Sequence, residues 1–128
     1  MPIESDVIAV IDDDPMMRIA LKGLLSAFGY TVEIYASGEA FLQVAATCNA
    51  LCLLVDVHLG SGSGFDLARQ LAVAGFKFPI IFMTERADAE MAQRVIEAGG
   101  VGFLQKPFAG HLLMEILRRS KAGGSSHS

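Results

Sequence analysis

The sequence predicts one α/β domain in which five parallel β-strands alternate with five α-helices, a (βα)5 arrangement. A length of 128 residues suits a single domain. Five short apolar runs are separated by segments whose apolar residues recur at helical spacing, and this alternation implies right-handed crossovers and a parallel sheet. Hydrophobic residues make up 52% of the chain and charged residues 19%, which favours a sheet covered by helices on both faces.

The predicted strands are the five apolar runs at residues 7–11, 31–35, 51–55, 79–83 and 101–104. The first, third and fourth runs are continuously apolar, as in strands buried between two layers of helices. The second run has Glu33 between apolar neighbours, which favours a place nearer the edge of the sheet.

The predicted helices begin and end at residues suited to those positions. Asp14 and Pro15 have the order of an N-cap followed by an N1 proline, and Gly29 follows the end of the same helix. The other predicted signals are N-caps at Ser37 and Asp88 and terminal glycines at Gly75 and Gly99.

Two helices have apolar faces that predict how they lie on the sheet. The fifth helix is predicted at residues 109–121, and the polar segment 122–128 as a flexible tail, either the start of a linker or a remnant of expression. The domain is therefore predicted to span residues 1–121. The faces are Met17, Leu21, Leu24, Leu25 and Phe28 in the first helix and Leu112, Leu113, Ile116 and Leu117 in the fifth.

Composition also argues against several classes of protein. A formal net charge of −4 argues against direct binding of nucleic acid by this domain. No apolar run approaches the roughly 20 residues of a membrane span, and no secretory signal opens the chain, so we expect a cytoplasmic protein. Cys48 and Cys52 lack the number and spacing of a disulfide framework or zinc site and are expected to be buried small apolar residues.

Polar side chains follow four of the predicted strands. The first strand ends in Asp12 and Asp13, the third in Asp56 and the fourth in Thr84, and the fifth leads to Lys106. Ligands of open parallel sheets bind beyond the carboxyl ends of the strands. Adjoining carboxylates repel unless a cation joins them, and such oxygen ligands suit Mg²⁺. Lysine and threonine can donate to phosphate oxygens, and a carboxylate can be the nucleophile, so the residues predict Mg²⁺-assisted phosphorylation of an aspartate.

Each of these residues alone also has an ordinary structural explanation. Asp14 is expected to be only a helix cap, and Asp56 alone is equally explained as a cap of the turn after its strand. Thr84 and Lys106 in isolation suit a capping hydroxyl and an exposed ammonium group. The functional interpretation depends on their occurring together and in order.

The sequence resembles the response-regulator receiver family over residues 7–119, in four motifs that each close the expected strand. The resemblance implies the flavodoxin-like, doubly wound strand order 2-1-3-4-5. The motifs are Val-Ile-Asp12-Asp13-Asp14, Leu-Val-Asp56, Phe-Met-Thr84 and Phe103-Leu-Gln-Lys106-Pro107-Phe108.

The resemblance implies a signalling phospho-acceptor that assists its own phosphorylation and dephosphorylation, not a conventional enzyme. Asp56 would take the phosphoryl group from a sensor histidine kinase or a phosphotransfer protein, and Lys106 would pair with that group. Asp13 would bind Mg²⁺ directly and Asp12 mainly through water. Asp56 and the backbone carbonyl of His58 would complete the protein ligands.

The resemblance also implies a switch. Thr84 would move inward to hydrogen-bond to the phosphoryl group, and Phe103, at the aromatic switch position, would fill the vacated space. The altered surface, residues 88–121, would contact an output domain or target protein, and a homodimer is left open. The Lys106–Pro107 peptide would be cis, because proline lowers the free-energy cost of a cis peptide bond.

Some positions depart from the family pattern. Glu85 stands where a small residue is usual and could crowd an incoming phosphoryl group. The run Gly-Ser-Gly-Ser-Gly from Gly60 to Gly64 replaces a loop that usually contains proline, which suggests a looser loop. Arg86 and His58 fall at positions that modulate phosphoryl lifetime in the family, so these departures affect the expected rates more than the expected chemistry.

Three alternatives stay open at this point. A haloacid-dehalogenase-type phosphatase would use the D-x-D spacing of Asp12 and Asp14, but it needs a later acidic pair and the chain has only the separated Asp88 and Glu90 after Thr84. A flavodoxin-like binding protein would share the topology, but the first loop is acidic where a phosphate cradle would be rich in hydroxyls and glycine. Glu85 keeps open a phosphorylation-incompetent pseudo-receiver.

Overall fold

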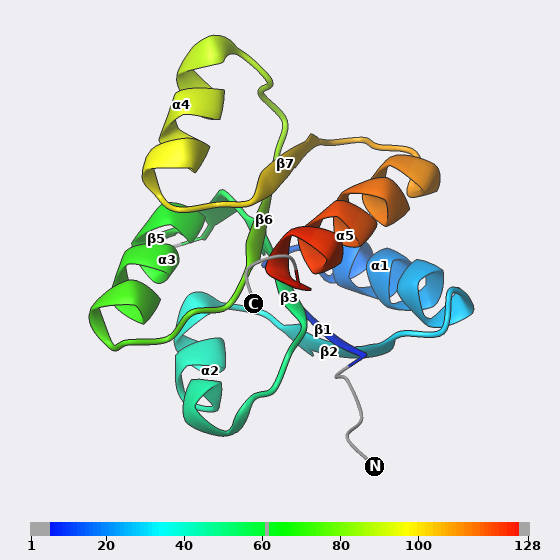
Figure 1. Ribbon diagram of the computed structural model, residues 1–128, viewed down its shortest axis with the longest axis horizontal. Coiled ribbons are helices and arrows are strands. Elements are labelled where there is room, and N and C mark those ends of the chain that lie inside the picture. Colours follow the sequence, from blue (N-terminus) through cyan, green and yellow to red (C-terminus); the bar gives the residue numbers. More distant parts are fainter. Residues whose placement is uncertain (1–5, 61, 126–128) are drawn as a thin grey trace.

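The computed structural model describes residues 6–60 and 62–125, and a five-stranded sheet crosses its centre. Figure 1 shows α2, α3 and α4 on one face of that sheet and α1 and α5 on the other. The strands of the sheet are β1 (Val7–Ile11), β2 (Thr31–Tyr35), β3 (Cys52–Asp56), β6 (Ile80–Thr84) and β7 (Gly102–Gln105). The helices are α1 (Pro15–Ala27), α2 (Gly38–Leu42), the 3₁₀ turn η1 (Ala45–Thr47), α3 (Gly64–Val73), α4 (Ala89–Glu97) and α5 (Gly110–Ser125).

The five strands are all parallel and lie in the order β2-β1-β3-β6-β7. Counted along the chain among these five, this is the order 2-1-3-4-5, so the predicted fold class and topology are confirmed. β2 is an edge strand, as Glu33 suggested. A second sheet was not predicted: β4 (His58–Leu59) and β5 (Gly62–Ser63) form a short antiparallel pair directly after β3.

Side chains that alternate along the strands build two separate cores, because successive residues of a strand point to opposite faces. Ile8 and Val10 of β1 lie in the core under α1 and α5, whereas Ala9 and Ile11 lie in the core under α2, α3 and α4. Every residue of β3 and β6 is buried. The central strands are therefore covered on both faces, and their carboxyl ends are fixed in a closely packed frame.

The helix signals act as the sequence predicts. Asp14, Ser37 and Asp88 accept hydrogen bonds from the backbone N–H groups of Met16 (3.0 Å), Ala40 (3.0 Å) and Met91 (2.8 Å), respectively. The predicted terminal glycines Gly29, Gly75 and Gly99 all have positive φ, which supports their place after helix ends.

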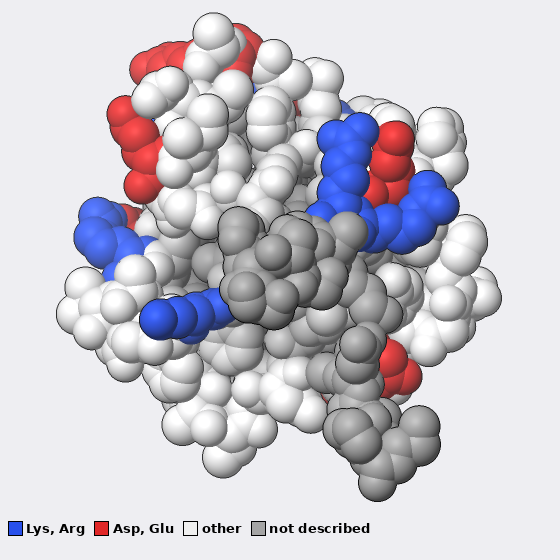
Figure 2. Space-filling model, viewed as in Figure 1, with Lys and Arg blue, Asp and Glu red and all other residues white. Residues whose placement is uncertain are grey.

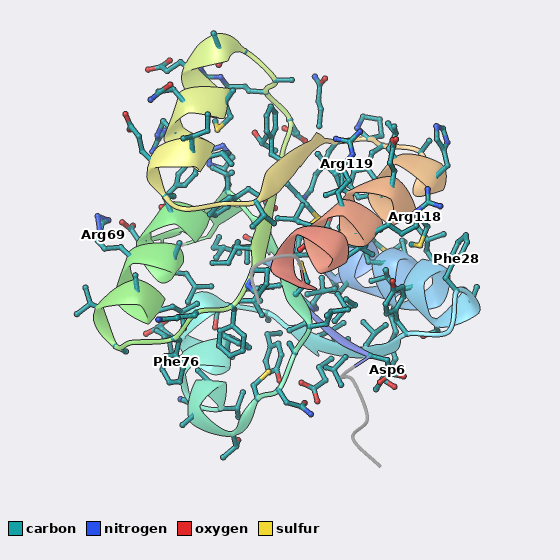
Figure 3. All side chains as sticks on the ribbon, viewed as in Figure 1. Asp6, Phe28, Arg69, Phe76, Arg118 and Arg119 are labelled. Atoms are coloured by element: carbon teal, nitrogen blue, oxygen red, sulfur yellow. The ribbon has the colours of Figure 1, made fainter. Side chains whose placement is uncertain are left out.

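Some predicted details are wrong. Phe28 is 58% exposed at the end of α1, at the edge of the molecule in Figure 3, because it follows the last helical turn and not the buried face. Leu112 is 42% exposed, since the face of α5 toward the sheet is centred on the buried Leu113 and Leu117, four residues apart, with Ile116 partly buried beside them. Cys52 is buried as expected, but Cys48 is only partly buried.

The limits of the elements also differ slightly from the predicted ones. β3, β6 and β7 each end one residue later than the apolar runs, so Asp56 and Thr84 are the last residues of strands. α5 continues to Ser125, beyond the predicted end at residue 121, because glycine in a last turn lowers helix stability without forbidding the helix. Residues 126–128 of the predicted tail lie outside the described residues. In the described part of the chain, no helix combines the length and apolarity that crossing a membrane requires.

Candidate functional site

Three carboxylates meet where the adjacent strands β1 and β3 end. Asp12 follows β1 and is fully buried, Asp13 is exposed, and Asp56 is the last residue of β3 with 8% exposure. One carboxylate oxygen from each of the three lies within 4.8 Å of the others. The structure thus brings together the acids that the sequence predicts as metal ligands, although Asp56 lies 43 residues after Asp13 in the chain.

Both the carboxylate and the backbone of Asp12 are hydrogen-bonded. Its Oδ1 accepts the backbone N–H of Asp14 at 2.9 Å, and its own N–H donates to the carbonyl of Tyr35 at 3.1 Å. Nη1 of Arg18, one turn into α1, donates to the Asp12 carbonyl at 2.7 Å. A buried carboxylate is costly unless it is hydrogen-bonded, and the bond from Asp14 N–H satisfies one of its two oxygens, while the other contacts hold the backbone of Asp12.

Lys106 joins two of the carboxylates. Its Nζ donates to Asp12 Oδ2 at 2.9 Å and to Asp56 Oδ2 at 2.8 Å, and its side chain is only 12% exposed. The backbone N–H of Lys106 donates to the carbonyl of Thr84 at 2.7 Å, which ties the loop after β7 to the end of β6. The Lys106–Pro107 peptide is cis, as the resemblance implied.

The charges of Asp56 and Lys106 depend on each other. Burial raises the pKa of Asp56 and the negative charge of Asp12 adds to this, while hydrogen bonds from Lys106 and from the N–H of His58 (3.0 Å) oppose it. Burial alone would lower the pKa of Lys106, but its hydrogen bonds to Asp56 and Asp12 outweigh burial and raise that pKa. Lys106 therefore remains an ammonium group at neutral pH.

The donor set suits a divalent cation. With the three acids ionised, Lys106 neutralises one of three negative charges and leaves two unmatched. Mg²⁺ prefers carboxylate oxygens together with water, and the exposed Asp13 gives this cluster an open side toward solvent. The residues present therefore fit Mg²⁺.

Thr84 lies buried at the end of β6, one residue after the Met83 that pairs with Asp56 in the sheet. Its Oγ1 accepts the backbone N–H of Arg86 at 3.0 Å. The guanidinium of Arg86 donates to Asp88 at 2.6 Å and to Glu90 at 3.1 Å, so the loop that carries Thr84 is attached to the first turn of α4. Glu85 is exposed, and its carbonyl accepts from the side-chain amide of Gln105 at 3.2 Å.

Phe103 is partly buried on β7 and pairs with Phe82 of β6 in the sheet register. Two residues further along β7, Gln105 pairs with Thr84. His58 contributes its backbone N–H to Asp56, and its side chain is exposed. Both residues thus lie near the site, but within the described part of the chain the His58 side chain makes no hydrogen bond to the carboxylates.

Two residues were missed by the sequence reasoning. Arg18 supports the Asp12 carbonyl, and the only signal was a basic residue one turn into the helix that follows the acid pair. Gly64 begins α3 so close to β3 that an added Cβ would lie 2.4 Å from the Asp56 carbonyl oxygen and 2.8 Å from Val55 Cγ1. Only glycine allows α3 to start so close to β3. The glycines at every second position from 60 to 64 were the one sequence feature that pointed to this close approach.

Comparisons with known proteins agree with this geometry. Residues 8–118 match the family described as response regulator receiver domain. The chain is 36% identical over 118 residues to the response regulator protein TodT of Pseudomonas putida, a match that covers 92% of this chain and 52% of that protein. It is 32% identical over 111 residues to the transcriptional regulatory protein FixJ of Rhizobium meliloti, covering 87% of this chain and 54% of that protein. The chain thus spans about half the length of these curated relatives.

Solved structures show the same fold. The crystal structure of FixJ-N superposes with a TM-score of 0.84 at 30% identity and covers 95% of this chain and 96% of that chain. The Vibrio cholerae chemotaxis protein CheY4 superposes with a TM-score of 0.83 at 27% identity, covering 91% of this chain and 98% of that one. These matches give no support to the phosphatase or the flavodoxin-like alternative.

Proposed function

Because the chain belongs to the response regulator receiver domain family, we propose that it works by accepting a phosphoryl group on Asp56, with Mg²⁺ bound by Asp12, Asp13 and Asp56. The chain is a receiver domain of two-component signalling. The observation that carries the residue assignment is the bridge of Lys106 between Asp12 and Asp56 at the edge of the three-carboxylate cluster.

Asp56 suits the role of nucleophile. Its carboxylate is held by the His58 N–H on one oxygen and by Lys106 on the other, so that its orientation is set before a phosphodonor arrives. Attack by a carboxylate oxygen on phosphorus forms an acyl phosphate, and the bond from phosphorus to the donor nitrogen or oxygen breaks. Formation of that acyl phosphate, a mixed anhydride, removes the carboxylate charge of Asp56 with which Lys106 is paired.

Lys106 then suits the role of partner for the phosphoryl oxygens. Its ammonium group lies 2.8 Å from Asp56 Oδ2 and also donates to Asp12. It therefore needs no large movement to reach a phosphoryl group attached to Asp56. Mg²⁺, when bound, would neutralise charge on the transferring phosphoryl group. Asp13 and Asp12, with Asp56 and the backbone carbonyl of His58, are the proposed protein ligands.

Thr84 is proposed to read the phosphorylation state. Its hydroxyl accepts the N–H of Arg86, and it is buried within the same edge of the sheet as Asp56. A hydrogen bond donated by its hydroxyl to a phosphoryl oxygen would bring Thr84 inward, and Phe103 is proposed to occupy the space that it leaves. The domain would also assist its own dephosphorylation, in which water attacks phosphorus and the bond to the Asp56 oxygen breaks, because the same groups stabilise the charge on the transferring phosphoryl group.

The proposed partners follow from the site. The phosphodonor is a sensor histidine kinase or a phosphotransfer protein, and the phosphorylated form presents the face of α4, β7 and α5 to an output domain, a target protein or a second copy of the chain. Acidic side chains gather over α4 and Lys and Arg side chains over α5, so this face has charges of both signs (Figure 2). We also propose a cytoplasmic location, where response regulators typically act.

The test is phosphorylation in vitro with a small phosphodonor. The chain is incubated with Mg²⁺ and acetyl phosphate, and the expected result is an intact-mass increase of one phosphoryl group that requires Mg²⁺ and is absent in Asp56→Asn. Peptide analysis after trapping should locate the group on Asp56. A phosphoryl group on another residue, or none at all in the presence of Mg²⁺, would contradict the proposal, and the second result would favour the pseudo-receiver.

A further inference from the structure

In the loop after β3, Gly60 lies against Asp13. Gly60 has φ +59°, in the left-handed region that residues with a side chain rarely adopt. A Cβ built on its backbone would lie 3.3 Å from Asp13 Oδ2, tighter than an ordinary Cβ contact. Among the described residues, this oxygen is the one atom that such a Cβ would meet within 4 Å.

We propose that Gly60 is a positioning residue for the metal site. Its missing side chain leaves Asp13 the space that the carboxylate needs to share a cation with Asp12 and Asp56. This inference rests on the proposed function, because the cation is the same.

Asp13 is the least supported of the three acids. Asp12 and Asp56 are each held by Lys106 and by a backbone N–H, from Asp14 and His58 respectively. Across residues 6–60 and 62–125, no hydrogen bond holds the carboxylate of Asp13. Its position therefore depends on what it packs against, and a methyl group at position 60 would displace it without breaking a bond.

The solvent around Asp13 leads to the same conclusion. Mg²⁺ keeps several of its waters when it binds proteins, so its carboxylate ligands need room for water beside them. Asp13 and Gly60 are both exposed, and the glycine leaves the near side of Oδ2 open. A methyl group 3.3 Å from that oxygen would occupy this room, and displacement and dehydration would both weaken cation binding.

The experiment is an NMR titration with Mg²⁺ alone of the wild-type chain and Gly60→Ala. Two matched controls separate space from strain. Gly62→Ala lies in the same loop without positive φ and with nothing within 4 Å of the new Cβ. Gly29→Ala has φ +95° and again nothing within 4 Å, so it has the backbone strain without the contact.

The expected result is a dissociation constant for Mg²⁺ about tenfold higher in Gly60→Ala, the size typical of residues that support metal ligands. Gly62→Ala and Gly29→Ala should keep the wild-type constant, although Gly29→Ala should melt at a lower temperature. Unchanged Mg²⁺ affinity in folded Gly60→Ala, or an equal loss in Gly29→Ala, overturns the inference and leaves the proposed function standing. A wild-type chain that binds no Mg²⁺ overturns both.

A second variant covers the case in which Gly60→Ala does not fold. Asparagine tolerates the left-handed region better than alanine but still carries a Cβ, so Gly60→Asn should fold with the same contact to Asp13. Its Mg²⁺ affinity should also fall, and an unchanged affinity there overturns the inference in the same way.

Discussion

Asp56 carries a charge that the folded protein disfavours. Burial and the neighbouring Asp12 raise its pKa above the ordinary value, in spite of Lys106. A carboxyl group whose folded-state pKa is raised stabilises the fold when it is protonated, at pH below its unfolded value near 3.9. That contribution is lost as pH rises through the folded pKa, so at neutral pH the ionised group destabilises the domain.

We therefore expect Asp56→Asn to raise the thermal midpoint by a few degrees at pH 7 in the absence of divalent cations, while it abolishes phosphorylation. The amide keeps the shape, but its single oxygen can accept only one of the two hydrogen bonds that the Asp56 oxygens accept from His58 N–H and Lys106. The measurement is thermal unfolding of both proteins in EDTA. The gain in thermal midpoint should shrink as Mg²⁺ is added, because the cation stabilises only the wild-type cluster. A lower midpoint for Asp56→Asn than for the wild-type chain in EDTA would show that the pairing with Lys106 outweighs the cost of burying Asp56.

Asp13 and Asp14 are neighbours with separate roles. Asp13→Ala removes a proposed Mg²⁺ ligand and should raise the dissociation constant by more than about tenfold, since even supporting residues contribute that much. Asp14→Ala removes only the N-cap bond to Met16 and should cost about 1 kcal/mol of unfolding free energy with unchanged Mg²⁺ affinity. Magnesium titration and denaturant unfolding of both variants check this, and equal Mg²⁺ affinities in the two would remove Asp13 from the site.

At the scale of elements, the junction from β3 through the β4–β5 pair to α3 sets the position of Asp56. Gly64 N–H donates to the Val57 carbonyl at 2.8 Å, and Val57 N–H donates to the Met83 carbonyl at 2.8 Å. The chain therefore turns back over the end of its own strand, and α3 begins in contact with it. Ser63, which the sequence reasoning did not identify, caps α3 by accepting the N–H of Asp66 at 3.1 Å.

This contact predicts a large effect of a small change. Gly64→Ala would place a methyl group 2.4 Å from the Asp56 carbonyl oxygen, so α3 or β3 must move. We expect a loss of about 1–3 kcal/mol in unfolding free energy, as for other overpacked sites, and slower phosphorylation. Urea unfolding measures it, with Gly62→Ala, which meets nothing within 4 Å, as the control. Equal stabilities of the two variants would mean that β3 and α3 can move apart at this junction with little cost in unfolding free energy.

At the scale of the whole molecule, the site and the proposed output face belong to one packed frame. β6 carries Thr84 at its end, and Arg86 connects the following loop to Asp88 and Glu90 on α4. The cation–π contact of Arg94 over Phe65 (4.6 Å) joins α4 to α3. A phosphoryl group can act at a distance only through an element that has two arrangements with different affinity for it, and Thr84 with Phe103 is the candidate.

We expect beryllofluoride with Mg²⁺, a mimic of the phosphoryl group, to change amide shifts or exchange across α4, β7 and α5 as well as around Asp12, Asp56 and Lys106. Phenylalanine lacks a hydroxyl that could anchor an outward position, so the two states of Phe103 should differ less in free energy than those of a tyrosine. The matched variant Thr84→Ala should confine the changes to the site. Changes confined to the site in the wild-type chain as well would show that this switch does not operate.

The sequence by itself determined the five parallel strands, most of the helix limits and which polar groups meet at one edge of the sheet. Asp14, Ser37 and Asp88 cap helices through bonds to residues two or three positions away, and such local bonds follow from the order of residues alone. The continuous apolar runs predicted buried parallel strands because a strand covered on both faces needs apolar residues at every position. The acids and Lys106 were found because parallel strands all end at one edge of the sheet.

Only the tertiary structure decided how these groups meet. Lys106 lies 94 residues from Asp12 and 50 from Asp56, and its bridge between them depends on strand order and on the loop after β7. The pKa shifts of Asp56 and Lys106 also arise only in the folded chain, from burial and from this bridge. The contact of Gly60 with Asp13, the closeness of Gly64 to β3 and the support of Asp12 by Arg18 likewise arise from packing between segments. A residue's type limits what it can contact, but the distance to its partner is set by the elements packed between them.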